Sequence, residues 1–343
     1  MPLRTRTAAP TGRAAPRCRN RGRRAHRRSR RLAAVALLAA ALVWPALAQA
    51  AGGAAVAAQS ARAVVDDSGR RVALAHRATR IITLAPSATE LVFAAGAGGA
   101  VVGVIKGSDY PPAATRLPVI GDVTALNLER IVALAPDLVV TWPWTTPGEV
   151  AWLRGHGVAV FEANPSRISG IADDIERIGV LAGTLTTAAH AANRFRDELT
   201  ALGRAAPAGP PLAVFYQVSS SPIFTLGGSQ LVSEAIARCG GRNVFASLPF
   251  AAAQVGVEAV LAAKPQVIIA GTDDAVRPPW LDDWRRWPEL PAVRDGNLFV
   301  VDANLLHRPG PRFVDGMASL CRALAVARSA TGRGTHAAAP PNL

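Results

Sequence analysis

Short apolar runs alternate with segments of helical character along most of the chain. Runs rich in Val and Ile, the pattern of buried strands, occupy Arg80–Pro86, Val101–Ile105, Leu138–Thr141 and Gly157–Asn164. Between them lie segments with apolar residues at helical spacing, namely Ser87–Gly96, Leu128–Ala135 and Ile168–Gly183. This alternation predicts a mostly parallel sheet covered by helices.

A longer segment, Thr186–Arg204, interrupts the alternation and predicts one extended helix. It contains good helix formers, no Pro, and no Gly before Gly203, and it would extend about 28 Å. The alternation resumes after Ala205–Pro211, with strands expected at 212–218, 266–271 and 297–302, and helices at 229–241, 257–263 and 311–327. The pattern therefore predicts the α/β class, with two Rossmann-like β/α lobes joined by a single long backbone helix.

One short sequence motif occurs twice in the chain. Asn127–Trp142 and Gly256–Gly271 each contain a Glu that stands seven positions before a Pro, and each Pro opens an apolar run of strand type. A helix–strand step used once per lobe explains the apolar positions of both copies. It does not explain Glu129 and Glu258, although a carboxylate in the first turn of a helix is favoured by the helix dipole.

The same patterns predict the boundaries of the domains and terminal segments. A hairpin is expected within Ala61–Leu74, because two short apolar runs flank Asp67-Ser68-Gly69. The predicted parts are a cleaved export signal at 1–50, a flexible start with the β-hairpin at 51–79, an N-terminal α/β lobe at 80–184, an inter-lobe backbone helix at 185–205, a C-terminal α/β lobe at 206–330 and a disordered tail at 331–343.

The basic composition of the chain is concentrated at its start. The whole sequence has 38 Lys and Arg against 24 Asp and Glu, and residues 1–31 alone hold 12 Arg and no acidic residue. The rest of the chain therefore has 26 basic and 24 acidic residues. A nearly neutral folded part excludes the basic groove or stripe of a nucleic-acid-binding protein.

An apolar stretch, Leu32–Ala50, follows the basic start and ends with Ala at alternate positions. A basic start, an apolar middle and small residues at the end are typical of an export signal. The alternative is a membrane anchor, but Pro45 interrupts the stretch before the roughly 20 residues that a membrane span needs. We therefore expect an exported protein that is soluble after signal cleavage.

Two of the three cysteines, Cys239 and Cys321, lie outside the export signal. An oxidising compartment would permit them to form a disulfide, and the alternative is a pair of buried free thiols. A disulfide would close a loop of 82 residues. In the chain-entropy account, closing such a loop in the unfolded chain raises the free energy of unfolding by about 4 kcal/mol.

Several segments together resemble a known family. They are "RIITLAPSATELVFAAG", "SDYPP", "NLERIVALAPDLVVTW", "ARCGGRNVF", "VEAVLAAKPQVIIAG" and "RPGPR". They are similar to the periplasmic cobalamin (vitamin B12)-binding proteins, within the helical-backbone metal-chelate receptors that supply ABC importers. The likeness extends over roughly Ala61–Ala327. It implies the class III periplasmic binding protein fold, in which a single rigid helix joins two lobes and the ligand lies in the cleft between them.

The resemblance also implies roles for individual residues. It pairs the Cys of the "CGG" turn with the Cys of the last helix, which are Cys239 and Cys321 here. It assigns Glu129 and Glu258, one acid per lobe, to docking on Arg pockets of the permease dimer in the inner membrane. A permease with two-fold symmetry presents the same Arg cluster twice, so a monomeric receptor needs two acids at matching positions.

Candidate ligand-binding residues lie where the strands end, since ligands of open α/β sheets bind there. Trp142, Trp144 and Phe250 offer broad apolar faces for a flat macrocycle. Arg308 and His307 suit carboxylate or amide oxygens of a ligand. The complete set of expected ligand-binding residues is Gly107, Trp142, Trp144, Tyr216, Phe250, Asn304, His307 and Arg308.

At several positions the sequence differs from the cobalamin-binding proteins, so the identity of the ligand is not decided by the resemblance. Gly107 and Val123 stand where the relatives have a Tyr and a Trp, and "NLLHRPGPR" at Asn304–Arg312 replaces an acidic and aromatic run. A related corrinoid, haem or a ferric siderophore therefore remain alternatives as ligand. His307 has two interpretations, as a metal ligand or as an ordinary hydrogen-bonded side chain. No resident metal or cofactor is expected, because the metal chelate itself is the transported ligand.

The sequence contains no enzyme signature such as G-x-S-x-G, H-E-x-x-H or a Walker loop. We therefore expect a receptor without catalytic activity. A nitrogenase-like metal-cluster protein, which shares similar β/α lobes, is disfavoured by the export signal and by the lack of a Cys cluster. The expected partners are a small metal chelate and an ABC permease dimer, with no nucleic acid, and the expected state is a monomer.

Overall fold

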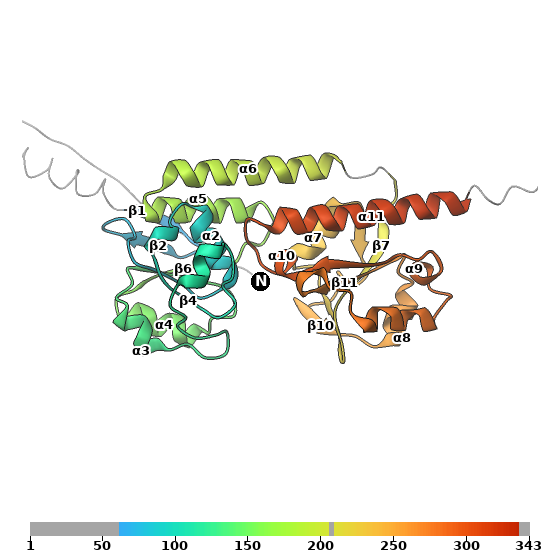
Figure 1. Cartoon of the computed structure of the whole chain (residues 1–343), viewed down its shortest axis with the longest axis horizontal. Helices are drawn as coiled ribbons and strands as arrows, with labels where there is room; N and C mark the ends of the chain where they lie inside the picture. Colours follow the sequence, from blue (N-terminus) through green and yellow to red (C-terminus); the bar gives the residue numbers. More distant parts are fainter. Residues whose placement is uncertain (1–61, 206–208, 336–343) are drawn as a thin grey trace, which may run out of the picture. The chain divides into compact units, whose positions relative to one another are not determined.

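The computed structural model describes residues 62–205 and 209–335 (Figure 1). The predicted export signal at 1–50, the residues directly after it and the end of the predicted tail lie outside these ranges. By its contacts the chain divides into Met1–Gln59 and Ser60–Leu343. The description that follows concerns the second unit.

The first lobe contains a parallel sheet of four strands in the order β4-β3-β5-β6. Val and Ile dominate the strands, and β3 and β5 are buried throughout, as expected for a sheet covered on both faces. The strands are β3 (Ile81–Thr83), β4 (Val101–Val104), β5 (Leu138–Thr141) and β6 (Ala159–Glu162). The helical elements are α2 (Pro86–Ala94), α3 (Leu128–Ala133), α4 (Pro147–Gly155), α5 (Gly170–Ala182) and the 3-10 turns η1 (Gly98–Ala100) and η2 (Pro112–Arg116).

Helix α4 was not expected from the apolar pattern, although its start carries a clear local signal. The Thr146 side chain accepts a hydrogen bond from the Glu149 amide, and the Glu149 carboxylate accepts one from the Thr146 amide at 2.8 Å. Pro147 occupies the first turn, where its fixed φ suits a helix. This capping box therefore identifies a helix that the apolar spacing does not.

The predicted hairpin precedes the first lobe and is confirmed. Strands β1 (Arg62–Val65) and β2 (Arg71–Leu74) pair in antiparallel fashion. The Asp66 carboxylate stabilises the turn, because it accepts from the amides of Ser68 and Arg70 at 3.0 and 2.9 Å.

The second lobe has a six-stranded sheet in the order β10-β8-β7-β11-β12, with β9 paired to β7. Strands β7, β9, β11 and β12 pair in parallel, whereas β8 is antiparallel to both of its neighbours, β7 and β10. The bounds are β7 (Leu212–Ser220), β8 (Ile223–Leu226), β9 (Gly241–Asn243), β10 (Ala252–Gln254), β11 (Val267–Thr272) and β12 (Leu298–Asp302). The short strands β8, β9 and β10 were not predicted.

Helices complete the second lobe and include the last helix of the chain. They are α7 (Leu231–Arg238), α8 (Val257–Ala263), α9 (Pro291–Arg294), α10 (Ala303–Leu306), α11 (Phe313–Thr335) and the 3-10 turns η3 (Asp273–Ala275) and η4 (Pro279–Arg286). Helix α11 extends beyond its predicted end at Ala327 and includes the first residues of the segment assigned to a disordered tail. No Pro interrupts the sequence between these points, and isolated Gly residues weaken a helix without ending it.

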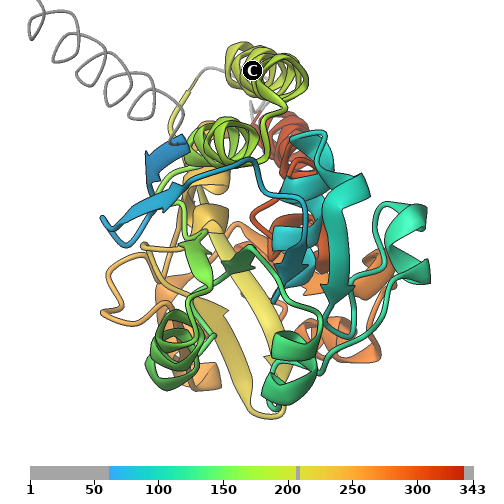
Figure 2. The same ribbon diagram turned by 90° about the vertical axis from the view of Figure 1, so that its left-hand side faces the viewer.

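A single helix, α6 (Leu185–Arg204), connects the two lobes where the sequence predicts the long helix. Figures 1 and 2 both show α6 alongside α5 and α11, and α6 also contacts α2. Its buried residues Ala188, Ala192, Phe195 and Leu199 follow helical spacing. They belong to one apolar cluster that extends from Ile81 in the first sheet to Val214 in the second. The lobes therefore share a continuous core.

The disulfide between Cys239 and Cys321 is present and joins the end of α7 to α11. Cys239 is buried within the shared core. The disulfide therefore confirms the first of the two alternatives, and the cysteines are not free thiols.

Replacing both cysteines with Ala should lower the free energy of unfolding by about 4 kcal/mol, because the unfolded chain regains the entropy of an 82-residue loop. Urea denaturation of the variant and the oxidised wild type measures this difference. Reduced wild type should behave like the variant. Equal midpoints for the oxidised wild type and the variant would contradict the stabilising role.

Candidate functional site

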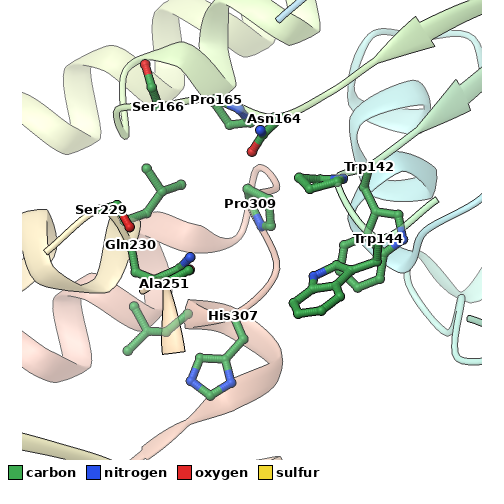
Figure 3. Close-up of a pocket in the computed structure, with 13 residues that line it drawn as sticks. Trp142, Trp144, Asn164, Pro165, Ser166, Ser229, Gln230, Ala251, His307 and Pro309 are labelled. Atoms are coloured by element: carbon green, nitrogen blue, oxygen red, sulfur yellow. The ribbon is translucent and has the colours of Figure 1, made fainter. Parts of the chain in front are cut away.

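A cavity of about 380 Å³ lies between the lobes and is lined from both sides (Figure 3). The first lobe contributes the residues that follow β5 and β6, namely Trp142, Pro143, Trp144, Asn164, Pro165 and Ser166. The second lobe contributes Ser229, Gln230, Leu231, Ala251, Leu306, His307 and Pro309. The site therefore forms where strands end, as expected for ligands of open α/β sheets.

Two aromatic residues form the first-lobe side of this cavity. The ring centroids of Trp142 and Trp144 are 6.4 Å apart, with their planes inclined by 55°. Trp142 packs against the shared core, whereas the side chain of Trp144 is 71% exposed. Figure 3 shows both tryptophans on one side of the cavity and Ser229 and Gln230 of the second lobe on the other. Such aromatic faces suit a flat, largely apolar ligand.

His307 lies on the second-lobe side, at the end of α10. Its Nε2 atom is 3.0 Å from the hydroxyl of Tyr216, which is fully buried. Burial lowers the pKa of His307, and the negative charges of Asp273 and Asp302 act in the opposite direction with smaller effect. His307 is therefore neutral at neutral pH, and Tyr216 fixes the orientation of its ring rather than lining the cavity.

Asn304 and Arg308 do not line the cavity; they bond to each other, and Arg308 also bonds to the first lobe. Arg308 Nη2 donates to the Asn304 side-chain oxygen at 2.7 Å, and Nη1 donates to the Asp109 carboxylate at 2.6 Å. Burial would raise the pKa of Asp109, but the hydrogen bond and charge of Arg308 outweigh it, so the pKa is lowered. In this structure Arg308 connects the lobes and Asn304 supports its guanidinium, and neither residue lines the cavity.

A buried carboxylate, missed by the sequence analysis, lies next to this contact. Glu90 of α2 is 1% exposed, and Arg312 from the start of the last helix binds both its oxygens at 3.0 and 2.6 Å. Arg308 lies 3.8 Å from Glu90, and the Arg312 guanidinium stacks 4.0 Å from the centre of the Tyr110 ring. Burial raises the pKa of Glu90 more than the Arg312 hydrogen bond and charge lower it.

We call Glu90, Asp109, Arg308 and Arg312 the cross-lobe ion cluster. Both acids belong to the first lobe and both arginines to the second. Gly310 lies against Glu90, where a side chain would crowd the carboxylate. The cluster therefore holds the "RPGPR" segment of the second lobe against α2 of the first.

The remaining predicted ligand residues lie near the cavity rather than in its wall. Phe250 is 65% exposed and directly precedes the lining residue Ala251. Gly107 occupies the turn after β4 with a φ of +87°, a conformation that favours glycine. Of the eight predicted ligand residues, Trp142, Trp144 and His307 line the cavity. Asn164, Pro165 and Ser166 also line the cavity and were not predicted, although they lie at or directly after the end of the predicted strand Gly157–Asn164.

The two copies of the repeated unit form matching corners of the two lobes. Glu129 and Glu258 are both exposed and lie in the first turns of α3 and α8. Each helix ends with a left-handed residue before the Pro, Ala135 at φ +44° and Lys264 at φ +46°. Figure 1 shows α3 and α8 on the side of the lobes opposite to α6. The protein therefore presents one acid per lobe on a common side.

Among residues 62–205 and 209–335, no group of three or more His, Cys, Asp or Glu side chains is placed to hold a metal ion. Within the same ranges, no helix combines the length and the apolar character that a membrane crossing requires.

Comparison with known proteins identifies the family of the chain. Residues 81–305 match the periplasmic binding protein family. A vitamin B12-binding protein of Vibrio cholerae serotype O1 is 37% identical over 253 residues, which are 73% of this chain and 91% of that protein. The chain belongs to the periplasmic binding protein family.

Solved structures of periplasmic binding proteins agree with this assignment. The crystal structure of the periplasmic vitamin B12 binding protein BtuF of Vibrio cholerae superimposes with a TM-score of 0.67 and 36% identity, over 73% of this chain and 98% of that one. The periplasmic heme-binding protein RhuT from Roseiflexus sp. RS-1 gives a TM-score of 0.63 and 26% identity, over 72% and 98%. The family resemblance and the α/β fold class predicted from the sequence are therefore confirmed.

Proposed function

We propose that this periplasmic binding protein captures cobalamin or a related corrinoid between its lobes and delivers it to an ABC importer. The observation that carries this proposal is the 37% identity to a vitamin B12-binding protein over 91% of that protein's length. The cavity supports it, because the paired Trp142 and Trp144 offer aromatic faces to a flat ring. The protein performs no chemistry on the ligand and needs no cofactor of its own.

Ligand recognition divides between the aromatic and the polar residues of the cavity wall. Trp142 and Trp144 contact the apolar ring, while Asn164, Ser229 and Gln230 supply hydrogen-bonding groups for amide side chains at the ring's edge. Phe250 closes the rim from the second lobe. The other predicted residues act from outside the cavity wall. Gly107 shapes the turn after β4, and Tyr216 orients His307. Arg308, supported by Asn304, maintains the contact between the lobes.

Delivery depends on the two exposed acids. Glu129 and Glu258 have no side-chain hydrogen bond or ion pair within the described part of the chain, so both are available to an external arginine. They dock on two Arg clusters of a permease dimer in the inner membrane, where charge-assisted contacts fix the register. The receptor acts in the periplasm as a monomer, after the export signal at 1–50 is removed, and it binds no nucleic acid.

Titration of the purified protein with cyanocobalamin, dicyanocobinamide, haemin and ferric siderophores tests the ligand. We expect the corrinoids to quench the tryptophan fluorescence with a dissociation constant below about 1 μM, which corresponds to roughly −8 kcal/mol. A response to haemin or a siderophore with none to a corrinoid would overturn the proposed function.

Haem is the second candidate ligand. The 26% identity to a heme-binding protein and the neutral His307 at the cavity wall favour it. Neutral imidazole is a common ligand of iron. Haemin binding with a histidine-ligated iron spectrum that is lost in His307→Ala would establish this alternative.

A further inference from the structure

The loop between β6 and α5, residues 163–169, belongs to the walls of two separate pockets. Asn164, Pro165 and Ser166 line the ligand cavity, and Figure 3 shows Asn164 and Pro165 at its edge. Pro165 and Ser166 also line a polar pocket of about 170 Å³, whose wall includes residues of α5 and of the turn between β1 and β2. The loop is therefore a thin partition with space behind it, and its position sets the width of the ligand cavity.

Backbone amides at both ends of this loop donate to carboxylates from distant parts of the chain. The Asn164 amide donates to Asp67 Oδ2 at 2.6 Å, and Asp67 lies in the turn of the β1–β2 hairpin. The Ile168 amide donates to Glu234 Oε2 on α7 at 2.7 Å. Hydrogen bonds to an ionised acceptor are about twice as strong as those between neutral groups. The hairpin thus holds one end of the loop and the second lobe holds the other.

Asp67 is itself held in place by α5 and β6. Arg177 of α5 donates from Nη2 to Asp67 Oδ1, and the same nitrogen donates to the fully buried Asp174 at 2.6 Å. The Asp67 amide donates to the carbonyl of Glu162, the last residue of β6, at 3.1 Å. Asp67 therefore has a fixed position, from which it determines where the loop begins.

A glycine determines how closely the loop approaches α5 from the other side. Gly170 is the first residue of α5, and a Cβ atom at this position would lie 2.9 Å from Cβ of Pro165. Carbon atoms of packed side chains lie about 3.5–4.0 Å apart, so a larger residue would displace Pro165. The φ of Gly170 is outside the left-handed region. Glycine is therefore needed here for the close approach and not for the backbone conformation.

We propose that Asp67 is a positioning residue for ligand binding, which fixes the β6–α5 loop so that Asn164 and Pro165 meet the ligand at one cavity width. This inference rests on the proposed function and adds to it a residue that does not line the ligand cavity. Asp67 acts through its hydrogen bond to the Asn164 amide, and the contact between Gly170 and Pro165 limits the loop from behind.

Two substitutions displace the loop in opposite directions. In Asp67→Ala, the Asn164 amide loses its acceptor and the loop is free to move into the pocket behind it. In Gly170→Ala, the added methyl group pushes Pro165 away from α5. We expect each variant to bind cyanocobalamin about fivefold more weakly than the wild type, which corresponds to about 1 kcal/mol. Quenching of tryptophan fluorescence measures the dissociation constants.

Each substitution has a matched control elsewhere in the protein. Asp137→Ala also removes a carboxylate that accepts from two backbone amides, at 2.7 and 3.1 Å, and Asp137 lies outside the cavity wall. Gly203→Ala adds a methyl group to a helix where a Cβ atom meets nothing within 4 Å. Both controls should change the dissociation constant by less than about twofold. Urea denaturation shows that each variant is folded, and Gly170→Ala decides alone if Asp67→Ala is not.

Hydrogen exchange of the ligand-free protein tests the hold of Asp67 on the loop without any ligand. The Asn164 amide should exchange at least about tenfold faster in Asp67→Ala than in the wild type or in Asp137→Ala. Unchanged exchange at Asn164, or wild-type affinity for cyanocobalamin in either loop variant, overturns the positioning role while the proposed function stands. A wild type that binds no corrinoid overturns the proposed function, and the exchange at Asn164 then shows separately whether Asp67 holds the loop.

Discussion

Charge reversal at both docking acids should abolish uptake and leave ligand binding intact. In Glu129→Lys/Glu258→Lys, each lobe would present a cation to an arginine cluster, and truncating such a charge pair already costs about 2–5 kcal/mol. We expect ligand transport in proteoliposomes that contain the cognate permease to fall by at least about 100-fold. The dissociation constant for the ligand should change by less than about twofold, because neither acid lines the cavity between the lobes.

The control reverses two other exposed acids and so changes the net charge equally. Glu198 on α6 and Glu289 before α9 are exposed, and neither forms an ion pair within the described residues. Glu198→Lys/Glu289→Lys should transport at the wild-type rate. Normal transport by the Glu129/Glu258 variant, or equal loss in both double variants, would show that docking does not depend on these two positions.

Glu90→Ala should be among the most destabilising single substitutions in the protein. It leaves Arg312 without the carboxylate that binds it and removes a negative charge 3.8 Å from Arg308, and removal of one partner of a buried ion pair costs about 3–5 kcal/mol. We expect the free energy of unfolding, measured by urea denaturation, to fall by about 3 kcal/mol. Glu90→Gln should lose less, because its amide oxygen still accepts from Arg312.

Glu198→Ala provides the comparison for Glu90→Ala, because Glu198 also lies on a helix but is exposed and has no ion pair within the described residues. Its effect should remain within about 0.5 kcal/mol. If Glu90→Ala and Glu198→Ala unfold at the same urea concentration, the cross-lobe ion cluster contributes nothing to stability.

The regular parts of the fold could be predicted because the sequence repeats them locally. The apolar runs at β5 and β11 and the Glu–Pro spacing before them are visible without any knowledge of distant contacts. Strands β8 and β10 escaped prediction, since both are short and only partly buried. They depend on pairing, β10 with β8 and β8 with β7, which the local pattern does not show.

The site was only partly predictable, because its geometry depends on contacts between residues far apart in the chain. Trp142 and Trp144 were found from their place after a strand. Glu90 was not found, since a carboxylate near a helix start also suits the helix dipole. Only its partner Arg312, 222 residues away, shows that it is buried between lobes. Arg308 likewise was assigned to the ligand because Asp109 could not be identified as its partner.

The continuous core beneath α6 has a consequence for how the importer recognises a loaded receptor. Apolar packing that passes unbroken from one sheet to the other, together with a buried ion cluster across the same boundary, resists any wide swing of the lobes. We therefore expect the ligand-bound and ligand-free receptors to present nearly the same surface shape to the permease. The permease would then have to sense the cargo itself, through the part that protrudes beyond Trp144 and Phe250, or separate the lobes by force after docking.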